Sequence, residues 1–236
     1  REATGGRVAH PGGSLQLRSN AVLVLDQDQG EALYAKNTNV VMPIASITKL
    51  MTAMVVLDAR LPLDEVVAID ETDVDTLKNS GSRLRVGMEF SRRELLRLAL
   101  MASENRAAAA LGRAYPGGPG AFIAAMNLKA IQLGMASTRF VDATGLNSAN
   151  VSTARDLAQM VRAAYQYDLI RDFTTTPSHE VESSGSYRTL AFRNSNSLVR
   201  SGTWDIGLSK TGFIREAGRC LVMQAKIGSK PVIIVL

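Results

Sequence analysis

Strand patterns stand at both ends of this 236-residue chain, and helical patterns fill the middle. The runs 21–26 and 31–36, separated by Gln27-Asp-Gln-Gly30, are typical of a β-hairpin. Further strands are predicted at 206–210, 221–226 and 231–236. The order of strands, helices and strands favours one antiparallel sheet made from both ends of the chain, with helices inserted between them. It predicts an α/β (α+β) fold in which helices flank a five-stranded antiparallel sheet.

Helix signals dominate the central part of the sequence. Helices are expected at 46–59, 91–102, 107–113, 121–133 and from Thr153 to about 164. Ser91-Arg-Arg-Glu94 has the form of a capping box, in which the serine and the glutamate satisfy backbone groups at a helix start. Gly134 is a suitable helix terminator. These signals predict a compact helical region ahead of the late strands.

The change of period after Phe173 marks a boundary between lobes. The runs 179–183 and 187–192 flank a Ser-Gly turn and predict a second hairpin. We expect a sheet-containing lobe made of 1–60 and 175–236, and an inserted all-helical lobe at 61–174. The active site of such an arrangement is expected in the cleft between the lobes.

Composition and charge limit the function. No apolar run approaches the roughly 18 residues that cross a bilayer, so no transmembrane segment is expected. The net charge of +5 suggests an anionic neighbour, either nucleic acid or an anionic cell-wall polymer. The basic residues are scattered and aromatic residues make up only 5%, so no base-stacking surface is visible. We therefore expect no nucleic-acid binding.

Histidine and cysteine are too few for the commonest catalytic and metal sites. His10 lies in a Gly/Pro-rich leader and His179 in a polar hairpin, so neither offers the buried, oriented imidazole of a Ser-His-Asp triad. Cys220 alone cannot build a zinc site, and its apolar neighbours suggest a buried small side chain. No glycine-rich phosphate cradle follows a strand. We expect no metal and no cofactor, and a nucleophilic enzyme of this sequence needs another base.

The stretch Pro43-Ile-Ala-Ser-Ile-Thr-Lys-Leu50 supplies that base. Residues three apart on a helix have Cβ atoms about 5–6 Å apart, so Ser46 and Lys49 can come within hydrogen-bond reach. A lysine acts as a base only when neutral, and burial or a nearby cation lowers its pKa. Ser-x-x-Lys is a common tetrapeptide, however. Alone it favours a helix start with a solvated lysine over a catalytic pair.

Two later motifs make a catalytic role for this tetrapeptide the favoured interpretation. Ser103-Glu-Asn105 falls in a break between two expected helices, and Lys210-Thr-Gly212 falls in a late strand. In this order the three motifs resemble those of the low-molecular-mass penicillin-binding proteins, the D-alanyl-D-alanine peptidases. Further similarity covers 140–146, 150–157 and 213–221. The resemblance extends from about Ala21 to Leu236 and implies a β-lactamase/transpeptidase-like fold.

The resemblance implies roles for the first two motifs. Ser46 would be the acylated nucleophile and Lys49 its general base. Ser103 would relay a proton to the leaving amine. Asn105 would hold the peptide group of the substrate and help to position Lys49.

The third motif would bind the substrate along the strand. Lys210 would supply positive charge, and Thr211 would hydrogen-bond the terminal carboxylate of the substrate or the carboxylate of a β-lactam. Gly212 would let the strand lie against the substrate, because a Cβ would intrude there. The backbone N–H groups of Ser46 and Phe213 would form the oxyanion hole.

The implied activity is a serine D,D-peptidase acting on peptidoglycan. The run after the third motif, and the absence of a second β-rich domain, look more like the branch that cleaves D-Ala–meso-diaminopimelate cross-links than like the D,D-carboxypeptidases. Class A β-lactamases share the motifs but add a deacylating glutamate, which 138–147 lacks, so slow deacylation is expected. A non-catalytic β-lactam sensor is the remaining alternative.

The partners and the compartment follow from the same resemblance. Peptidoglycan stems are the expected partners, and β-lactams the expected covalent inhibitors at Ser46. The expected location is the periplasm, with a signal peptide removed or outside the sequence, and the expected state is a monomer. The natural chain is expected to continue past Leu236.

Overall fold

The computed structural model describes residues 17–184 and 189–236. His10 lies outside these residues. So does most of the turn expected around 184–187 in the second hairpin. Within them, no helix combines the length and the apolar character needed to cross a membrane.

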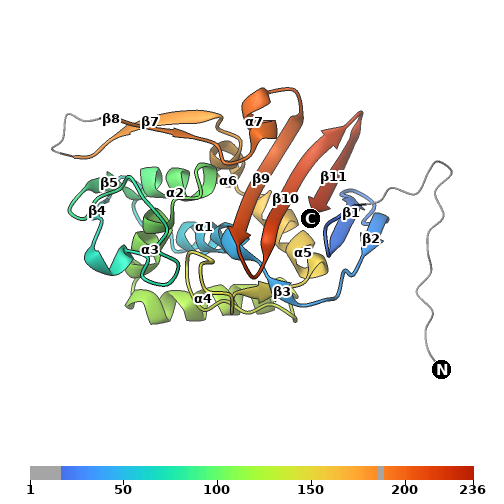
Figure 1. Ribbon diagram of the computed structural model, residues 1–236, viewed down its shortest axis with the longest axis horizontal. Coiled ribbons are helices and arrows are strands. Elements are labelled where there is room, and N and C mark those ends of the chain that lie inside the picture. Colours follow the sequence, from blue (N-terminus) through green and yellow to red (C-terminus); the bar gives the residue numbers. More distant parts are fainter. Residues whose placement is uncertain (1–16, 185–188) are drawn as a thin grey trace.

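A five-stranded antiparallel sheet forms one side of the molecule (Figure 1). Its spatial order is β2 (Ala32–Lys36), β1 (Val22–Asp26), β11 (Lys230–Val235), β10 (Gly218–Ile227) and β9 (Asp205–Ile214). The two ends of the chain meet where β1 pairs with β11, with Leu23 opposite Val235. The prediction of one antiparallel sheet made from both ends of the chain is confirmed.

The register of the sheet decides which side chains enter the interior. Val222 on β10 lies opposite Val235 on β11 and opposite Lys210 on β9. Residues directly opposite each other project from the same face of a sheet. Because Val222 and Val235 belong to the hydrophobic core, Lys210 projects toward the interior as well. The edge strand therefore turns a cationic side chain inward.

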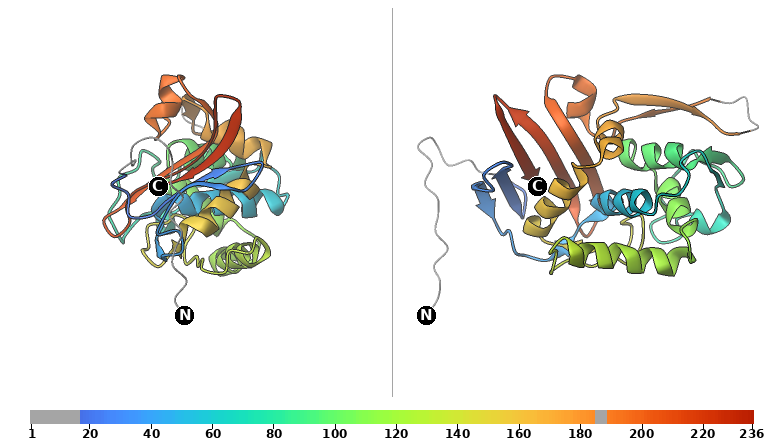
Figure 2. Two further views of the ribbon diagram at one scale, coloured as in Figure 1. Left: turned by 90° about the vertical axis from the view of Figure 1, so that its right-hand side faces the viewer. Right: turned by 180° about the vertical axis from the view of Figure 1, so that it is seen from behind.

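Seven α-helices pack beside the sheet in the described residues. They are α1 (Thr48–Asp58), α2 (Arg92–Met101), α3 (Asn105–Arg113), α4 (Gly118–Gln132), α5 (Ala154–Ala164), α6 (Asp168–Thr174) and α7 (Ser197–Ser201). Helix α1 is surrounded by α2 to α6, and α5 lies against β1, β10 and β11, as the view from behind in Figure 2 shows. Residues 48–56 of α1 are all buried. A helix that is apolar on every side is one that neighbours cover on every side.

Short elements complete the chain. They are β3 (Met42–Pro43), η1 (Ala45–Ile47), β4 (Val66–Ala68), η2 (Glu71–Asp73), β5 (Glu89–Ser91), β6 (Val151–Ser152), β7 (Ser178–Glu182) and β8 (Thr189–Arg193). Strands β4 and β5 pair within 61–174, so the expectation of an all-helical insertion was wrong in this detail. Strands of three residues are too short to show a period of two in the sequence.

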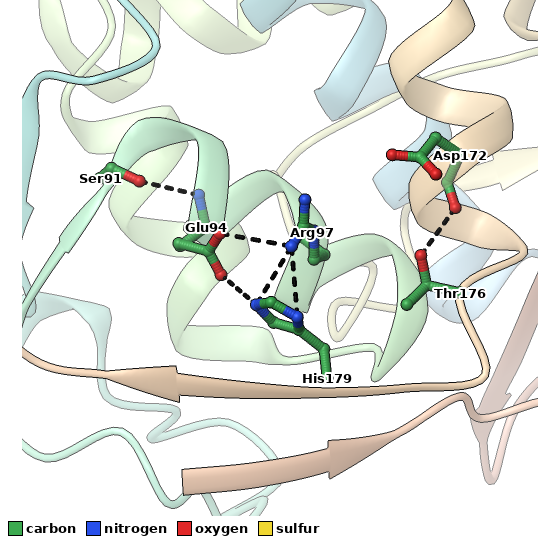
Figure 3. Close-up of polar contacts among 6 residues, drawn as sticks. All are labelled: Ser91, Glu94, Arg97, Asp172, Thr176 and His179. Carbon is green, nitrogen blue, oxygen red and sulfur yellow. Dashed lines mark hydrogen bonds and ion pairs between the residues drawn. The ribbon is translucent and has the colours of Figure 1, made fainter. Parts of the chain in front are cut away.

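The helix starts agree only partly with their motifs. Ser91 Oγ accepts a hydrogen bond from the backbone N–H of Glu94, at 3.2 Å. The Glu94 carboxylate does not return to the Ser91 backbone as a capping box requires. It contacts His179 on β7 instead, with Oε2 2.6 Å from Nε2 (Figure 3). His179, from a distant strand, has thus replaced the Ser91 backbone as the partner of the Glu94 carboxylate.

The same histidine holds the second hairpin onto the helices. In Figure 1, β7 and β8 extend away from the sheet over α2. Arg97 Nη1 lies 3.2 Å from each ring nitrogen of His179, and the Arg97 guanidinium lies over the Phe173 ring at 4.7 Å. The predicted hairpin is therefore present, and its only histidine serves to attach it to α2.

Candidate active site

Ser46 lies in η1, the single 3₁₀ turn that leads into α1, rather than in the α-helix itself. Lys49 lies in the first turn of α1, and its Nζ is 2.8 Å from Ser46 Oγ. The predicted i, i+3 contact is therefore present. Lys49 is completely buried and Ser46 is half-buried, so the hydroxyl can be reached while the amine is shielded.

The three partners of Lys49 suit a neutral amine. Nζ lies 2.7 Å from Asn105 Oδ1 and 2.7 Å from the Thr144 carbonyl oxygen, in addition to Ser46 Oγ. The amide and carbonyl oxygens can only accept hydrogen bonds, so they use both N–H bonds of an uncharged amine. The remaining lone pair then faces Ser46, whose hydroxyl can donate to it. This is the arrangement that a base needs toward its nucleophile.

Burial sets the pKa of Lys49. It lowers the pKa from the ordinary lysine value of 10.5 to about 7, against the opposing pull of the Asp142 and Glu104 carboxylates. Removal from water disfavours the ammonium form because an apolar interior solvates charge poorly. A neutral Lys49 is thus available near neutral pH.

Ser103 and Lys210 form a second pair beside the first. Lys210 is 1% exposed, and its Nζ donates to Ser103 Oγ at 2.9 Å and to the Thr211 carbonyl at 2.8 Å. Burial, and then the positive charge of Lys49, hold the pKa of Lys210 well below its usual value. Two buried amines thus each contact a serine hydroxyl, and the charge on Lys49 disfavours a charge on Lys210.

Asn105, the first residue of α3, is fixed at both ends of its amide. Oδ1 accepts from Lys49, and Nδ2 donates to Ser80 Oγ at 3.0 Å. The N–H of Lys49 requires the amide oxygen on its side, so Nδ2 faces Ser80, whose hydroxyl accepts from it. Ser80 thus holds the other end of the amide.

Gly212 brings the edge strand against the nucleophile. A Cβ on Gly212 would lie 2.9 Å from the backbone nitrogen of Ser46 and 3.1 Å from Ala45 Cβ. The strand can approach η1 this closely only without a side chain at this position. The next residue, Phe213, is 65% exposed. The close approach of Gly212 thus sets this part of β9 directly beside Ser46.

Strained backbone occurs next to both serines. Ala45 has φ +49° and Ser103 has φ +58°, in the left-handed region that ordinary side chains avoid. Gly145 supports the first of these turns, because a Cβ there would lie 1.9 Å from the carbonyl oxygen of Ala45. Such conformations concentrate where the surrounding structure holds a reactive group in place.

Three residues that contribute to the site lie outside the three sequence motifs. Thr144 supplies a backbone carbonyl to Lys49, Ser80 orients Asn105, and Ser195 Oγ accepts from Thr211 Oγ1 at 2.6 Å. The 140–146 similarity pointed to the first of them. No signal pointed to Ser80 or Ser195, because serines in loops are common and both act through contacts with distant segments.

All eight sequence-predicted residues lie in this one region. Ser46, Lys49 and Asn105 share one hydrogen-bonded network, and Ser103, Lys210 and Thr211 share another. Gly212 and Phe213 continue the strand that joins the second network to Ser46. Across residues 17–184 and 189–236, no group of three or more His, Cys, Asp or Glu side chains is placed to hold a metal ion.

Comparisons with known proteins found a matching family and similar relatives over most of the chain. A family model described as D-alanyl-D-alanine carboxypeptidase matches residues 7–236. A D-alanyl-D-alanine endopeptidase of Pseudomonas aeruginosa is 53% identical over 221 residues, which cover 94% of this chain and 71% of the relative. One from Escherichia coli is 50% identical over the same lengths. The Streptomyces K15 DD-transpeptidase crystal structure superimposes with a TM-score of 0.88 at 31% identity, covering 95% of this chain and 91% of that one.

Proposed function

The chain belongs to the D-alanyl-D-alanine carboxypeptidase family of serine peptidases, and we propose from this membership that it is an endopeptidase of peptidoglycan. The bond cleaved is the D-Ala–meso-diaminopimelate cross-link, through an acyl-enzyme on Ser46. The observation that carries the proposal is the buried contact of Lys49 Nζ with Ser46 Oγ, at 2.8 Å. Relatives named endopeptidase at 53% and 50% identity support this choice over terminal trimming.

Acylation begins at Lys49. Its neutral amine takes the Ser46 proton as Oγ bonds to the carbonyl carbon of the scissile amide. The carbonyl oxygen becomes an oxyanion, which the N–H groups of Ser46 and Phe213 stabilise. The C–N bond then breaks, and the amine of the leaving residue must gain a proton.

Ser103 and Lys210 serve the leaving residue. Ser103 Oγ is hydrogen-bonded to Lys210 Nζ. It passes its proton to the leaving amine and takes a proton from the Lys210 ammonium in return. The leaving residue carries a carboxylate next to its amine, and Thr211 binds it. A carboxylate in this position favours the ammonium form of Lys210, which offsets the lowering of its pKa by burial.

Acylation is expected to lose rate in acid. Below about pH 7, Lys49 becomes an ammonium and cannot accept the Ser46 proton, so the acylation rate falls about tenfold per pH unit. The measurement is the rate of covalent adduct formation with benzylpenicillin, by mass spectrometry between pH 5 and 8. Circular dichroism over the same range verifies that the protein stays folded. A rate that is constant from pH 5 to 8 would exclude Lys49 as the base.

Ser195 is expected to position Thr211. Its hydroxyl accepts a hydrogen bond from Thr211 Oγ1, which fixes the rotamer of the Thr211 side chain that binds the substrate carboxylate. The Ser195→Ala variant should lose about tenfold in kcat/KM through a higher KM, the effect of roughly one hydrogen bond. Adding Ser195→Ala to Thr211→Val should cause little further loss, because Ser195 acts through Thr211. The exposed neighbour Ser197 gives the matched control, Ser197→Ala, and equal losses in both variants would contradict the role.

Deacylation is proposed to be slow with β-lactams. The stretch 138–147 contains no glutamate to activate water against the acyl-enzyme. The β-lactams should therefore remain bound to Ser46 as inhibitors. Rapid turnover of nitrocefin would instead indicate a β-lactamase.

Two substrates separate the remaining alternatives. The purified protein is incubated with cross-linked muropeptide dimers and with free pentapeptides, and products are separated by chromatography. An endopeptidase converts dimers to monomers faster than it removes terminal D-Ala, whereas a carboxypeptidase does the reverse. A protein that is acylated by penicillin but cleaves neither is a sensor. The proposed compartment is the periplasm, where peptidoglycan is found, and the proposed state is a monomer.

A further inference from the structure

An ion pair connects the two sides of the site beyond the catalytic residues. Lys78 Nζ lies 2.5 Å from Glu216 Oε1, and the side chains are 30% and 41% exposed. Lys78 belongs to the loop that follows η2, and Glu216 to the turn between β9 and β10. The pair thus joins two segments that are 138 residues apart. None of the three motifs includes either residue.

The loop side of this pair is rigidly built. Asp75 accepts hydrogen bonds from the backbone N–H groups of Leu77, Lys78 and Ser80, at 2.8, 3.0 and 2.8 Å. Ser80 in turn accepts from Asn105 Nδ2 at 3.0 Å. Lys78 is therefore held two residues from a direct contact with the catalytic network.

The strand side is equally close to the site. Glu216 follows Phe213 by three residues, in the turn where Ile214 of β9 lies opposite Gly218 of β10. The hydrogen bond from Lys78 lowers the pKa of Glu216, so the carboxylate stays ionised. A charged group of each sign is thus kept at the end of the strand that carries Lys210, Thr211 and Gly212.

The proposed function gives the direction in which a substrate lies. The carboxylate of the leaving residue is at Thr211 and the scissile carbonyl is at Phe213, so the acyl half continues along β9 toward Glu216. Three residues of chain span at most roughly 10 Å, so the Glu216 backbone is within that distance of Phe213. That span suits the side chain of the residue preceding the scissile D-Ala.

We propose that Lys78 and Glu216 form a subsite for a zwitterionic side chain on the acyl half of the substrate. The free end of a meso-diaminopimelate side chain carries an ammonium and a carboxylate on one carbon. The ammonium binds Glu216 and the carboxylate binds Lys78, so one ion pair is exchanged for two. Exposed ion pairs contribute little stability, so opening this one is not prohibitive. The inference rests on the proposed function.

Binding to the Ser46→Ala variant tests the subsite independently of hydrolysis. The probes are acyl peptides ending in D-Ala-D-Ala, in which the preceding residue is meso-diaminopimelate, lysine or norleucine. The diaminopimelate peptide should bind at least tenfold more tightly than the norleucine peptide by calorimetry. Adding Glu216→Gln or Lys78→Gln should reduce this ratio about tenfold. The matched controls Glu180→Gln and Lys226→Gln, at exposed charges elsewhere, should leave the ratio unchanged.

The outcomes distinguish a substrate subsite from an ion pair with a purely structural role. If the ion pair only holds the loop to the strand, both Lys78→Gln and Glu216→Gln weaken all three peptides equally and the ratio stays constant, which overturns the proposal. Wild-type hydrolysis of the same peptides and of cross-linked dimers is measured separately. A selective but non-hydrolysing protein keeps the subsite and rejects the proposed function. A protein that hydrolyses its substrates without this selectivity keeps the proposed function and rejects the subsite. If no peptide binds, both the subsite and the proposed function are rejected.

Discussion

Replacing Ser46 with alanine is expected to abolish both penicillin acylation and peptide hydrolysis. The hydroxyl forms the acyl bond itself, and no other group in the site can replace it. Losing a serine nucleophile typically costs about 10⁴- to 10⁶-fold in rate. The measurement combines mass spectrometry of the penicillin adduct with hydrolysis of cross-linked muropeptides.

The same variant should remain folded. Ser46 is half-buried, and the change removes one oxygen without altering the η1 turn. Thermal unfolding within a few degrees of the wild type would show this. Ser197→Ala, which removes an exposed hydroxyl, is the matched control. An adduct that persists in Ser46→Ala would place the nucleophile on another residue and reject the mechanism.

Replacing Lys49 with methionine is expected to reduce acylation about 10³-fold, the usual contribution of a general base. Methionine keeps the unbranched shape of the side chain but cannot accept the Ser46 proton. The residual rate should also lose its dependence on pH around 7. Adduct formation between pH 5 and 8 measures both effects. Lys226→Met, at an exposed lysine, is the control.

Lys49 should also affect the stability of the fold. Its pKa is about 7 when folded and 10.5 ordinarily, so between these values the unfolded chain binds a proton that the folded chain does not. The free energy of unfolding contributed by this group therefore rises with pH in that window, by about 1.4 kcal/mol per unit. Urea unfolding at pH 7.5 and 9.5 should show a steeper rise in the wild type than in Lys49→Met, which keeps the similar contribution of Lys210. Equal pH dependence in both proteins would mean that Lys49 is protonated when folded.

The local motifs carried most of the information about the site. Ser46 and Lys49 are neighbours on a helical turn, so their contact could be predicted from spacing alone. The positions of Ser103 and Lys210 could not, because 107 residues separate two side chains that lie 2.9 Å apart. Only the resemblance to a known family joined them in advance. The register of the sheet, which turns Lys210 inward, is a tertiary property that strand patterns do not contain.

The features that were missed are those without a local signature. Helices α6 and α7 have seven and five residues, too few for a helical period to appear. The capping box at Ser91 was half wrong because His179, far along the chain, competes for Glu94. The left-handed conformation of Ala45 has no signal in an alanine. It follows from the close approach of Gly145, which comes from a different segment.

The pairing of β1 with β11 has a consequence for how the enzyme is made. Ser46 and Lys49 stand early in the sequence, whereas Lys210 stands far downstream of them, on β9. Until the late strands fold, β1 has an unpaired edge, and the polypeptide holds a serine without the surroundings that activate it. Contacts between distant segments also form slowly, because long loops must close first. Hydrolytic competence therefore comes late in folding, when β9 and β10 close over η1.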